Sequence, residues 1–280
     1  MFLAYKKGLT PNPDITCNTI IKFPLLWQAA LKLHADYIAT GHYARIKKTK
    51  SASYNLLAGK DKTKDQSYFL SELTQSDLQH TLFPIGNYTK TQVRRLAKKL
   101  KLPNHSRPGT KGICFVGNVP MKSFLQIKLK QKPGKVLDDN GKVIGTHTGS
   151  HCYTIGERAR PSVGIIITKG SNSQKRFFIA EKNLAKNTLL IVPEGNSMLK
   201  KNNFTLKNVH WINSKDKKLK LRAKVRVRHL GELMPSTLEL KDNKWHLTLH
   251  KPVASIAPGQ SAVFYIKDQL VCSGEISSLE

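Results

Sequence analysis

The hydrophobic pattern of this 280-residue chain changes character near Pro133, and the change restricts the folds that the chain can adopt. Before it, apolar residues recur at helical spacing, with short apolar strands between the helices, which is typical of an α/β domain. After it, short alternating segments are separated by turn residues, which is typical of small antiparallel sheets and barrels. The sequence therefore predicts an α/β part followed by β-rich parts.

Two helices and a strand define the first part. Pro24 fits the first turn of a helix, and residues 36–40 form a short apolar strand that ends at Gly41. Thr89 is expected to cap a second helix that is basic on its other faces, for which a solvated surface is the default interpretation. The apolar stripe of that helix consists of Val93, Leu96, Ala97 and Leu100.

Turn residues organise the region between Pro133 and about residue 203. Residues 138–141, Asp-Asp-Asn-Gly, predict a hairpin between two apolar pairs. Further strands are expected at 151–155, 176–180 and 188–192, and the polar stretch 194–203 predicts a linker.

Beyond the linker, apolar and basic residues alternate strictly. The apolar set is Leu221, Ala223, Val225 and Val227, and the basic set is Arg222, Lys224, Arg226 and Arg228. A strand with this alternation is expected to expose all four basic side chains on one face. A hairpin at 242–243 and strands at 261–266 and 269–272 would complete a small antiparallel sheet or barrel.

The chain is strongly basic, with 47 Lys and Arg against 18 Asp and Glu and a formal net charge of +29. Such a charge favours nucleic acid as a partner, because each phosphate that is neutralised releases counterions. The basic residues are scattered along the chain and no apolar run reaches the roughly 20 residues that span a bilayer, so we expect no membrane partner. Without a secretory pattern at the first residues, the expected location is the cytoplasm.

The four cysteines, Cys17, Cys114, Cys152 and Cys272, lie too far apart for a disulfide scaffold or paired zinc ligands, so no tightly bound metal is expected. Cys17 follows a turn-prone loop and precedes an apolar, helix-like run, where unpaired N–H groups can stabilise a thiolate. Cys114 stands in a short apolar run between glycines. An inert buried thiol remains the alternative for both, and Cys152 and Cys272 lie in patterns typical of strands.

Two polar stretches are candidates for ligand contact. Gly41 follows a predicted parallel strand, and a glycine there permits close approach of an adenine or a phosphate. Residues 64–67, Lys-Asp-Gln-Ser, could contact phosphates and base edges or form an ordinary loop. No triad or paired-carboxylate site is recognisable.

Seven ordered blocks of this sequence closely resemble the bacterial tRNA-specific 2-thiouridylases. They are residues 10–14, 17–18, 21–23, 35–45, 64–70, 82–86 and 112–115. The similarity continues more loosely through residues 141–145, 153–156 and 258–265, so it covers essentially the whole chain.

The resemblance implies a fold, a domain organisation and an activity. It implies an α/β domain of the adenine-nucleotide alpha-hydrolase type with a parallel sheet over residues 1–118, a β-rich tRNA-contacting domain over 119–197, and an antiparallel β-barrel over 198–280. Members of the family use ATP, with Mg as its usual counter-ion, to replace the 2-oxygen of the wobble uridine of tRNA with sulfur. The implied partners are tRNA and a persulfide sulfur-carrier protein.

The resemblance also implies roles for individual residues. Cys114 would carry the sulfur as a persulfide, and Cys17 would be the nucleophile that attacks it, leaving a Cys17–Cys114 disulfide to be reduced in each turnover. Gly41 would touch ATP. Asn12, Pro13 and Asp14 would line the target base, and the expected tRNA contacts are His42, Lys64, Asp65, Gln66, Arg228, His229 and Gln260. The exposed basic strand at 222–228 would then face phosphates.

This sequence departs from the family pattern in three places. The family opens with a strand and a Ser-Gly-Gly-Val-Asp-Ser-type loop that binds the pyrophosphate of ATP, and this motif is missing, so the chain is expected to start some tens of residues late. The run 109–111 before Cys114 is Gly-Thr-Lys, and residues 157–161 replace a Gln-Arg and glycine stretch. Two alternative functions follow: a catalytically incompetent RNA-binding remnant of the enzyme, and a thiol-redox protein that uses Cys17 and Cys114.

Overall fold

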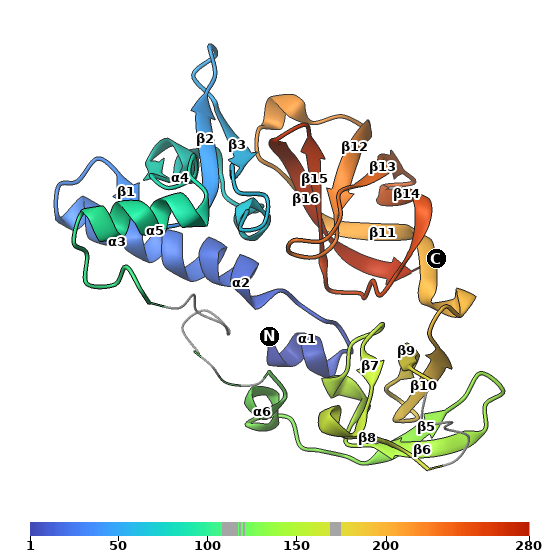
Figure 1. Cartoon of the computed structure of the whole chain (residues 1–280). Coiled ribbons are helices and arrows are strands. Elements are labelled where there is room, and N and C mark those ends of the chain that lie inside the picture. Colours follow the sequence, from blue (N-terminus) through green and yellow to red (C-terminus); the bar gives the residue numbers. More distant parts are fainter. Residues whose placement is uncertain (108–116, 118, 120, 169–174, 280) are drawn as a thin grey trace.

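The computed structural model describes residues 1–107, 117, 119, 121–168 and 175–279. Among these residues a helical, partly parallel amino-terminal part lies next to a carboxyl-terminal barrel, and a separate β sheet lies below both (Figure 1). The predicted succession of an α/β part, a β-rich centre and an antiparallel barrel is confirmed.

The amino-terminal part is built on helices and a two-stranded parallel sheet, in which β1 (Ile38–Ala39) pairs with β4 (Thr81–Leu82). The helices are α1 (Phe2–Lys6), α2 (Pro13–Thr16), a π-helix at Cys17–Lys22, α3 (Phe23–Lys32), a 3-10 helix at Ser67–Leu70, α4 (Gln75–Gln79) and α5 (Lys90–Lys99). Pro24 lies in the first turn of α3, as predicted.

Helix α5 begins where its cap predicts. The hydroxyl of Thr89 accepts a hydrogen bond from the Gln92 N–H, and the Gln92 side chain accepts one from the Thr89 N–H, which completes a capping box. The apolar stripe, however, is not buried. No residue of α5 is buried against the described chain, and Leu96 and Leu100 are 41% and 67% exposed.

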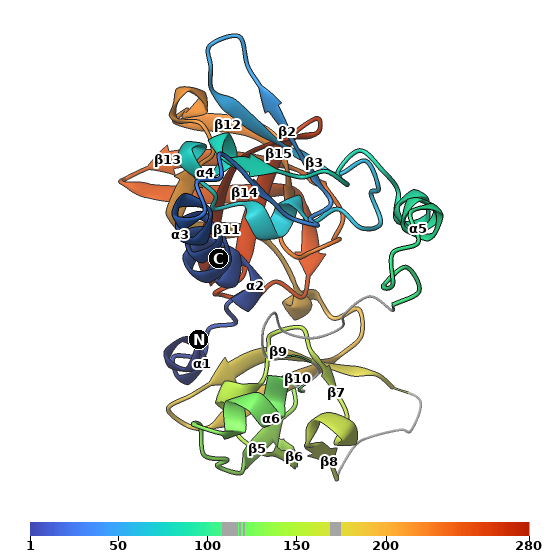
Figure 2. The ribbon, with the colours of Figure 1, turned by 90° about the vertical axis from the view of Figure 1, so that its left-hand side faces the viewer.

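The central sheet has six strands in the order β7-β9-β10-β5-β6-β8. Their bounds are β5 Gly134–Leu137, β6 Val143–His147, β7 Arg158–Ala159, β8 Ile165–Ile167, β9 Phe177–Asn183 and β10 Thr188–Pro193, with helix α6 at Met121–Gln126. The hairpin predicted at 138–141 joins β5 and β6. Helix α1 lies next to this part (Figure 2), and the rings of Phe2 in α1 and Phe124 in α6 stack 5.2 Å apart.

Two predictions for the centre were wrong. The strand expected at 151–155 is a 3-10 helix, Ser150–Cys152, so Cys152 lies outside any strand. Gly149, with a φ of 144°, precedes it and turns the chain out of the sheet. The expected linker at 194–203 is partly wrong as well, because β11 already begins at Lys200.

The carboxyl-terminal strands close into a six-stranded antiparallel barrel. They are β11 Lys200–Trp211, β12 Lys220–Arg226, β13 Met234–Lys241, β14 Lys244–Ala254, β15 Ser261–Ile266 and β16 Gln269–Leu279. Pairing of β11 with β16 closes the barrel. Asp242 and Asn243, both with positive φ, form the predicted hairpin turn between β13 and β14.

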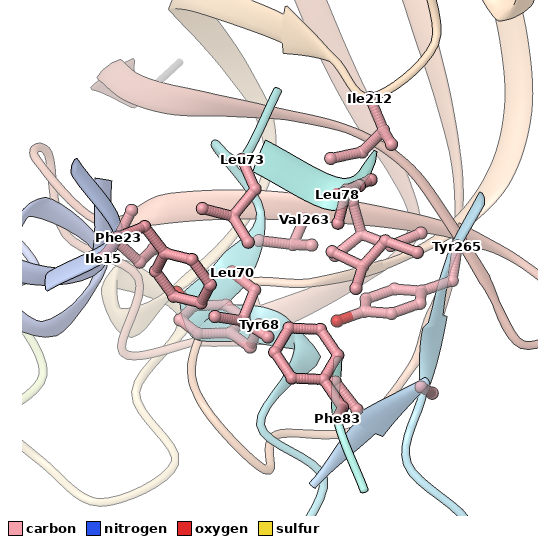
Figure 3. Close-up of a cluster of buried hydrophobic side chains, with 14 of the residues drawn as sticks. Ile15, Phe23, Tyr68, Leu70, Leu73, Leu78, Phe83, Ile212, Val263 and Tyr265 are labelled. Atoms are coloured by element: carbon pink, nitrogen blue, oxygen red, sulfur yellow. The ribbon is translucent and has the colours of Figure 1, made fainter. Parts of the chain in front are cut away.

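The barrel has a core of its own, but it also shares one sheet and one apolar cluster with the amino-terminal part. Strand β16 pairs with β3 (Tyr54–Ala58), which pairs with β2 (Ala44–Lys48), so an amino-terminal hairpin extends the barrel sheet. A single apolar cluster joins Phe23 and Leu70 to Val263 and Tyr265 (Figure 3). This shared core fixes the amino-terminal loops relative to the barrel loops.

No helix among the described residues is long and apolar enough to cross a membrane.

Candidate functional site

A hollow of about 390 Å³ brings the amino-terminal loop against the barrel and the start of the central part. We call it the base hollow. Its lining residues are Thr10, Pro11, Asn12, Pro13, Asp14, Tyr68, Val119, Met121, Val227, Arg228, His229 and Gln260. Six of the residues predicted to contact tRNA or the target base therefore meet here, although they lie at opposite ends of the sequence.

The start of α2 places Asp14 at the edge of the base hollow. The side-chain oxygen of Asn12 accepts hydrogen bonds from the N–H groups of Asp14 and Ile15, at 3.1 and 3.3 Å, and caps the helix. Pro13 occupies the first helical turn, where its lack of an N–H costs nothing. The Asn-Pro-Asp run thus fixes a carboxylate in the first turn of a helix whose N-terminus opens on the hollow.

Cys17 lies in a π-helix rather than before a helix, which corrects the sequence-based expectation. Helix α2, the π-helical segment Cys17–Lys22 and α3 form one continuous helical run, and Cys17 is buried within it. The helix dipole acts mainly within the first turn, and Cys17 lies beyond the first turn of this run. The dipole therefore stabilises a thiolate at Cys17 less than the sequence suggested. Short π-helical segments occur often at functional sites, and no sequence pattern used above could reveal this one.

The buried amide of Asn18 braces the π-helical segment. Its Nδ2 donates hydrogen bonds to the carbonyl oxygens of Asp14 and Phe69, at 3.0 and 3.2 Å, and its Oδ1 accepts one from Lys22 Nζ at 2.9 Å. The segment that carries Cys17 is thereby tied to the 3-10 helix at Ser67–Leu70, whose Tyr68 lines the base hollow.

His42 is buried beside this helical run. Its Nδ1 lies 2.8 Å from the Thr40 hydroxyl, and its Nε2 lies 3.5 Å from Lys22 Nζ. Burial, and secondly the charge of Lys22, lower the pKa of His42 to about 4. The imidazole is therefore neutral at neutral pH and does not present a positive charge to tRNA in this conformation.

This shift predicts a loss of stability in acid. Because the pKa of folded His42 lies below that of an unfolded histidine, about 6.5, the unfolded state binds the proton more tightly, and stability falls as the pH drops from about 6.5 to about 4. Protonation of His42 is expected to lower the free energy of unfolding by on the order of 3 kcal/mol. Denaturant unfolding of the wild type and His42→Gln across this range measures it. The other histidines are the same in both proteins, so only His42 can make their pH dependence differ. If the unfolding free energy depends on pH equally in the two proteins, the assignment to His42 is wrong.

Asp65 and Arg226 form a buried ion pair beneath the base hollow. The Asp65 carboxylate is 0% exposed, accepts hydrogen bonds from the Gly59 and Ser67 N–H groups at 3.0 Å, and lies 2.9 Å from Arg226 Nη1. The Arg226 guanidinium lies 5.4 Å from the centroid of the Tyr265 ring. The prediction that Arg226 stands on an exposed, phosphate-facing strand was therefore wrong, because a buried carboxylate from the amino-terminal part draws it inward.

Arg222 and Lys224 on β12 are exposed, and so is Lys64. Arg228 is exposed as well, but it lies in the bend after β12, which ends at Arg226 rather than at 228 as expected. Gln66 is half-buried, and its side-chain oxygen accepts a hydrogen bond from the Tyr43 N–H at 3.0 Å. Of the predicted set at 64–66, only Lys64 is thus well placed to meet a phosphate in the described conformation.

Aromatic rings form one wall of the base hollow. Tyr68 and His229 line the hollow; the Tyr68 hydroxyl donates to the Ser261 carbonyl oxygen at 2.8 Å, and the His229 ring packs from behind on Phe69, 4.1 Å away at 30°. Burial lowers the pKa of His229, and the nearby Asp65 carboxylate partly opposes this. Nδ1 of His229 is buried without a hydrogen-bond partner in the described chain. A wall of this kind suits a flat, uncharged ring that offers hydrogen-bonding groups at its edge.

Gly41 follows the carboxyl ends of the parallel strands β1 and β4. A Cβ built on it meets no atom within 4 Å, so the space beside it is open. Contact between Gly41 and ATP, expected at the carboxyl end of a parallel strand, stays a prediction.

The other cysteines differ in their surroundings. Cys272 is fully buried in β16, and Cys152 is half-buried; burial is the first cause that raises the pKa of both thiols. Cys114 lies outside the described residues. No cluster of three or more metal-ligating side chains occurs in the part of the chain that the structure describes.

Comparisons with known proteins match three family models in order along the chain. A tRNA methyl transferase HUP domain matches residues 1–118, a tRNA methyl transferase PRC-barrel domain matches 122–193, and an aminomethyltransferase beta-barrel domain matches 201–276.

Curated relatives match nearly the whole chain. The chain is 42% identical over 278 residues to the tRNA-specific 2-thiouridylase MnmA of Buchnera aphidicola subsp. Acyrthosiphon pisum, covering 98% of this chain and 74% of the relative. It is 40% identical to tRNA-specific 2-thiouridylase MnmA 2 of Aliarcobacter butzleri, with 97% and 75% covered, and 40% identical to MnmA 1 of Geobacillus kaustophilus, with 96% and 71% covered.

Proposed function

Because this chain belongs to the MnmA family of tRNA-specific 2-thiouridylases, which are tRNA sulfurtransferases, we propose that it transfers sulfur to C2 of the wobble uridine. The observation that carries the proposal is the base hollow, in which Asn12, Pro13 and Asp14 face Arg228, His229 and Gln260. A uridine splayed out of an anticodon loop would enter this hollow and stack against its aromatic wall.

The HUP domain of the family implies the use of ATP, and the open space at Gly41 is where we place one edge of the nucleotide. When bound, ATP would convert the 2-oxygen of the uridine into a leaving group. The described residues specify no site for the phosphates or for Mg.

In the proposed reaction a partner protein delivers sulfur to Cys114 as a persulfide. Cys17 then attacks the inner sulfur of this persulfide, a Cys17–Cys114 disulfide forms, and the released sulfide replaces the activated oxygen at C2. An external thiol reductant restores both cysteines. We propose that the Asp14 carboxylate, held in the first turn of α2, faces the base in this hollow.

The proposed tRNA contacts differ in burial, and Gln66, His229 and Gln260 are half-buried. Lys64 and Arg228 are exposed and would meet phosphates directly. His42 and Asp65 are buried, so we propose that they act by positioning: His42 through Lys22 on the helical run of Cys17, and Asp65 through Arg226, two residues before Arg228.

The function is tested by incubating the purified chain with unmodified tRNA, ATP and a persulfide donor, and by measuring 2-thiouridine in digested nucleosides by mass spectrometry. ATP-dependent 2-thiouridine is expected. Binding of tRNA without product would favour the RNA-binding remnant. Disulfide exchange without tRNA binding in a salt titration would favour a thiol-redox protein.

A further inference from the structure

A second hollow, of about 400 Å³, lies where α1 meets the central part. We call it the basic hollow. Leu129 and Leu184 supply its apolar lining, and the polar residues around it are Lys6, Lys128, Lys130, Lys132, Ser150, His151 and Asn187. None of the residues discussed for the base hollow belongs to it.

The charges of the basic hollow are all of one sign. No carboxylate lines it, and none of its four lysines takes part in an ion pair within the described chain. Four exposed ammonium groups around one concavity repel one another, and an anion that enters between them relieves this repulsion. The arrangement therefore selects for a ligand with several negative charges.

The wall of the basic hollow is braced by hydrogen bonds. The side chain of Asn187 accepts from the Ser150 N–H and hydroxyl, at 3.2 and 3.0 Å, and donates to the carbonyl oxygens of Lys132 and Pro133, at 2.9 and 3.0 Å. Lys128 Nζ lies 5.4 Å from the centroid of the Phe2 ring. The backbone of Lys132 and the side chain of Lys128 thus both have contacts within the chain before any ligand binds.

The basic hollow lies close to the base hollow. Lys6 lines the basic hollow, and Thr10 lines the base hollow. The two residues are four positions apart in the chain, so their Cα atoms are at most about 14 Å apart. That length corresponds to about four nucleotides of a stacked strand, at a rise of 3.4 Å each. The connecting segment is anchored, since the Thr10 hydroxyl lies 3.3 Å from that of Thr154.

From this geometry we propose that the basic hollow binds backbone phosphates of the RNA strand within a few nucleotides of the target uridine. The proposal rests on the proposed function, which places that uridine in the base hollow. It names an RNA backbone rather than an acidic protein because the two hollows are separated by the length of a short strand. Lysines suit this task, since they bind phosphates as flexible point charges without reading bases.

The test compares two triple variants that remove the same charge. Lys128→Gln, Lys130→Gln and Lys132→Gln together remove three of the four lysine charges around the basic hollow. Lys215→Gln, Lys217→Gln and Lys218→Gln neutralise three lysines that are also exposed. They lie on the loop between β11 and β12, on the side of the barrel away from the central sheet (Figure 1). The RNA is an anticodon stem-loop that contains the target uridine, and its affinity is measured across a salt series.

The basic-hollow variant is expected to bind at least ~10-fold more weakly at low salt, and the salt slope of its binding should fall by about two, since each phosphate contact on a single strand contributes about 0.7. The control variant should stay within ~3-fold of the wild type, because its change acts only through net charge. A wild type that does not bind the stem-loop would instead refute the proposed function.

Equal affinities of the two triple variants would overturn the proposal for the basic hollow alone. So would a basic-hollow variant that binds the RNA normally but accepts sulfur more slowly from its donor protein, because the ligand would then be a protein surface.

Discussion

Serine in place of Cys17 is expected to abolish formation of 2-thiouridine while leaving tRNA affinity unchanged. The thiolate is the nucleophile in sulfur chemistry, and a hydroxyl of nearly the same size is neither ionised nor able to form the disulfide. Loss of a covalent nucleophile typically lowers turnover by at least about 10³-fold, so the product should fall below detection. Nucleoside mass spectrometry measures the product, and filter binding measures the affinity. The same result is expected for Cys114→Ser.

Cys152→Ser is the matched control for these variants. Cys152 is half-buried in a 3-10 helix of the central part, and it plays no role in the proposed reaction. Cys272 is a poor control, because it is 0% exposed and its hydroxyl analogue would bury a new polar group in the barrel core. Normal 2-thiouridine from Cys17→Ser, or complete loss from folded Cys152→Ser, would refute the assignment of the cysteines.

Features with a local cause could be predicted from the sequence. The turns at 138–141 and 242–243, and the cap of α5 at Thr89, depend on residues that lie within a few positions of one another. Cys152 shows where local patterns fail: alternation suggested a strand, but the backbone leaves the sheet at Gly149.

Features that depend on contacts between distant segments could not be predicted. Pairing of β3 with β16 has no local cause, and neither does the inward turn of Arg226, which requires Asp65 from another part of the chain. For the candidate site, the family resemblance supplied the residues, and the structure supplied their burial. Arg228 and His42 were indistinguishable as expected tRNA contacts, yet only Arg228 is exposed.

Asp65→Asn is expected to lower the free energy of unfolding by about 3–5 kcal/mol, because it leaves the buried guanidinium of Arg226 without its counter-charge. Asparagine keeps the shape, and its Oδ1 can still accept the N–H groups of Gly59 and Ser67. The loss therefore reports the missing charge and the lost hydrogen bond from Arg226 rather than a cavity. Denaturant unfolding of both proteins measures the difference, with equal slopes as evidence that the folded state is otherwise intact.

Asp268→Asn is the control, since that carboxylate also pairs with basic side chains, Arg45 at 2.8 Å and Lys62 at 2.9 Å, but its side chain is 52% exposed. Its loss should cost less than about 1 kcal/mol. The double variant Asp65→Asn, Arg226→Met should recover much of the stability, because no unpaired charge then remains in the interior. If Asp65→Asn lowers the unfolding free energy no more than Asp268→Asn does, Asp65 is not a positioning residue beneath the base hollow. A direct contact between Asp65 and tRNA in another conformation would then explain its place in the family pattern better.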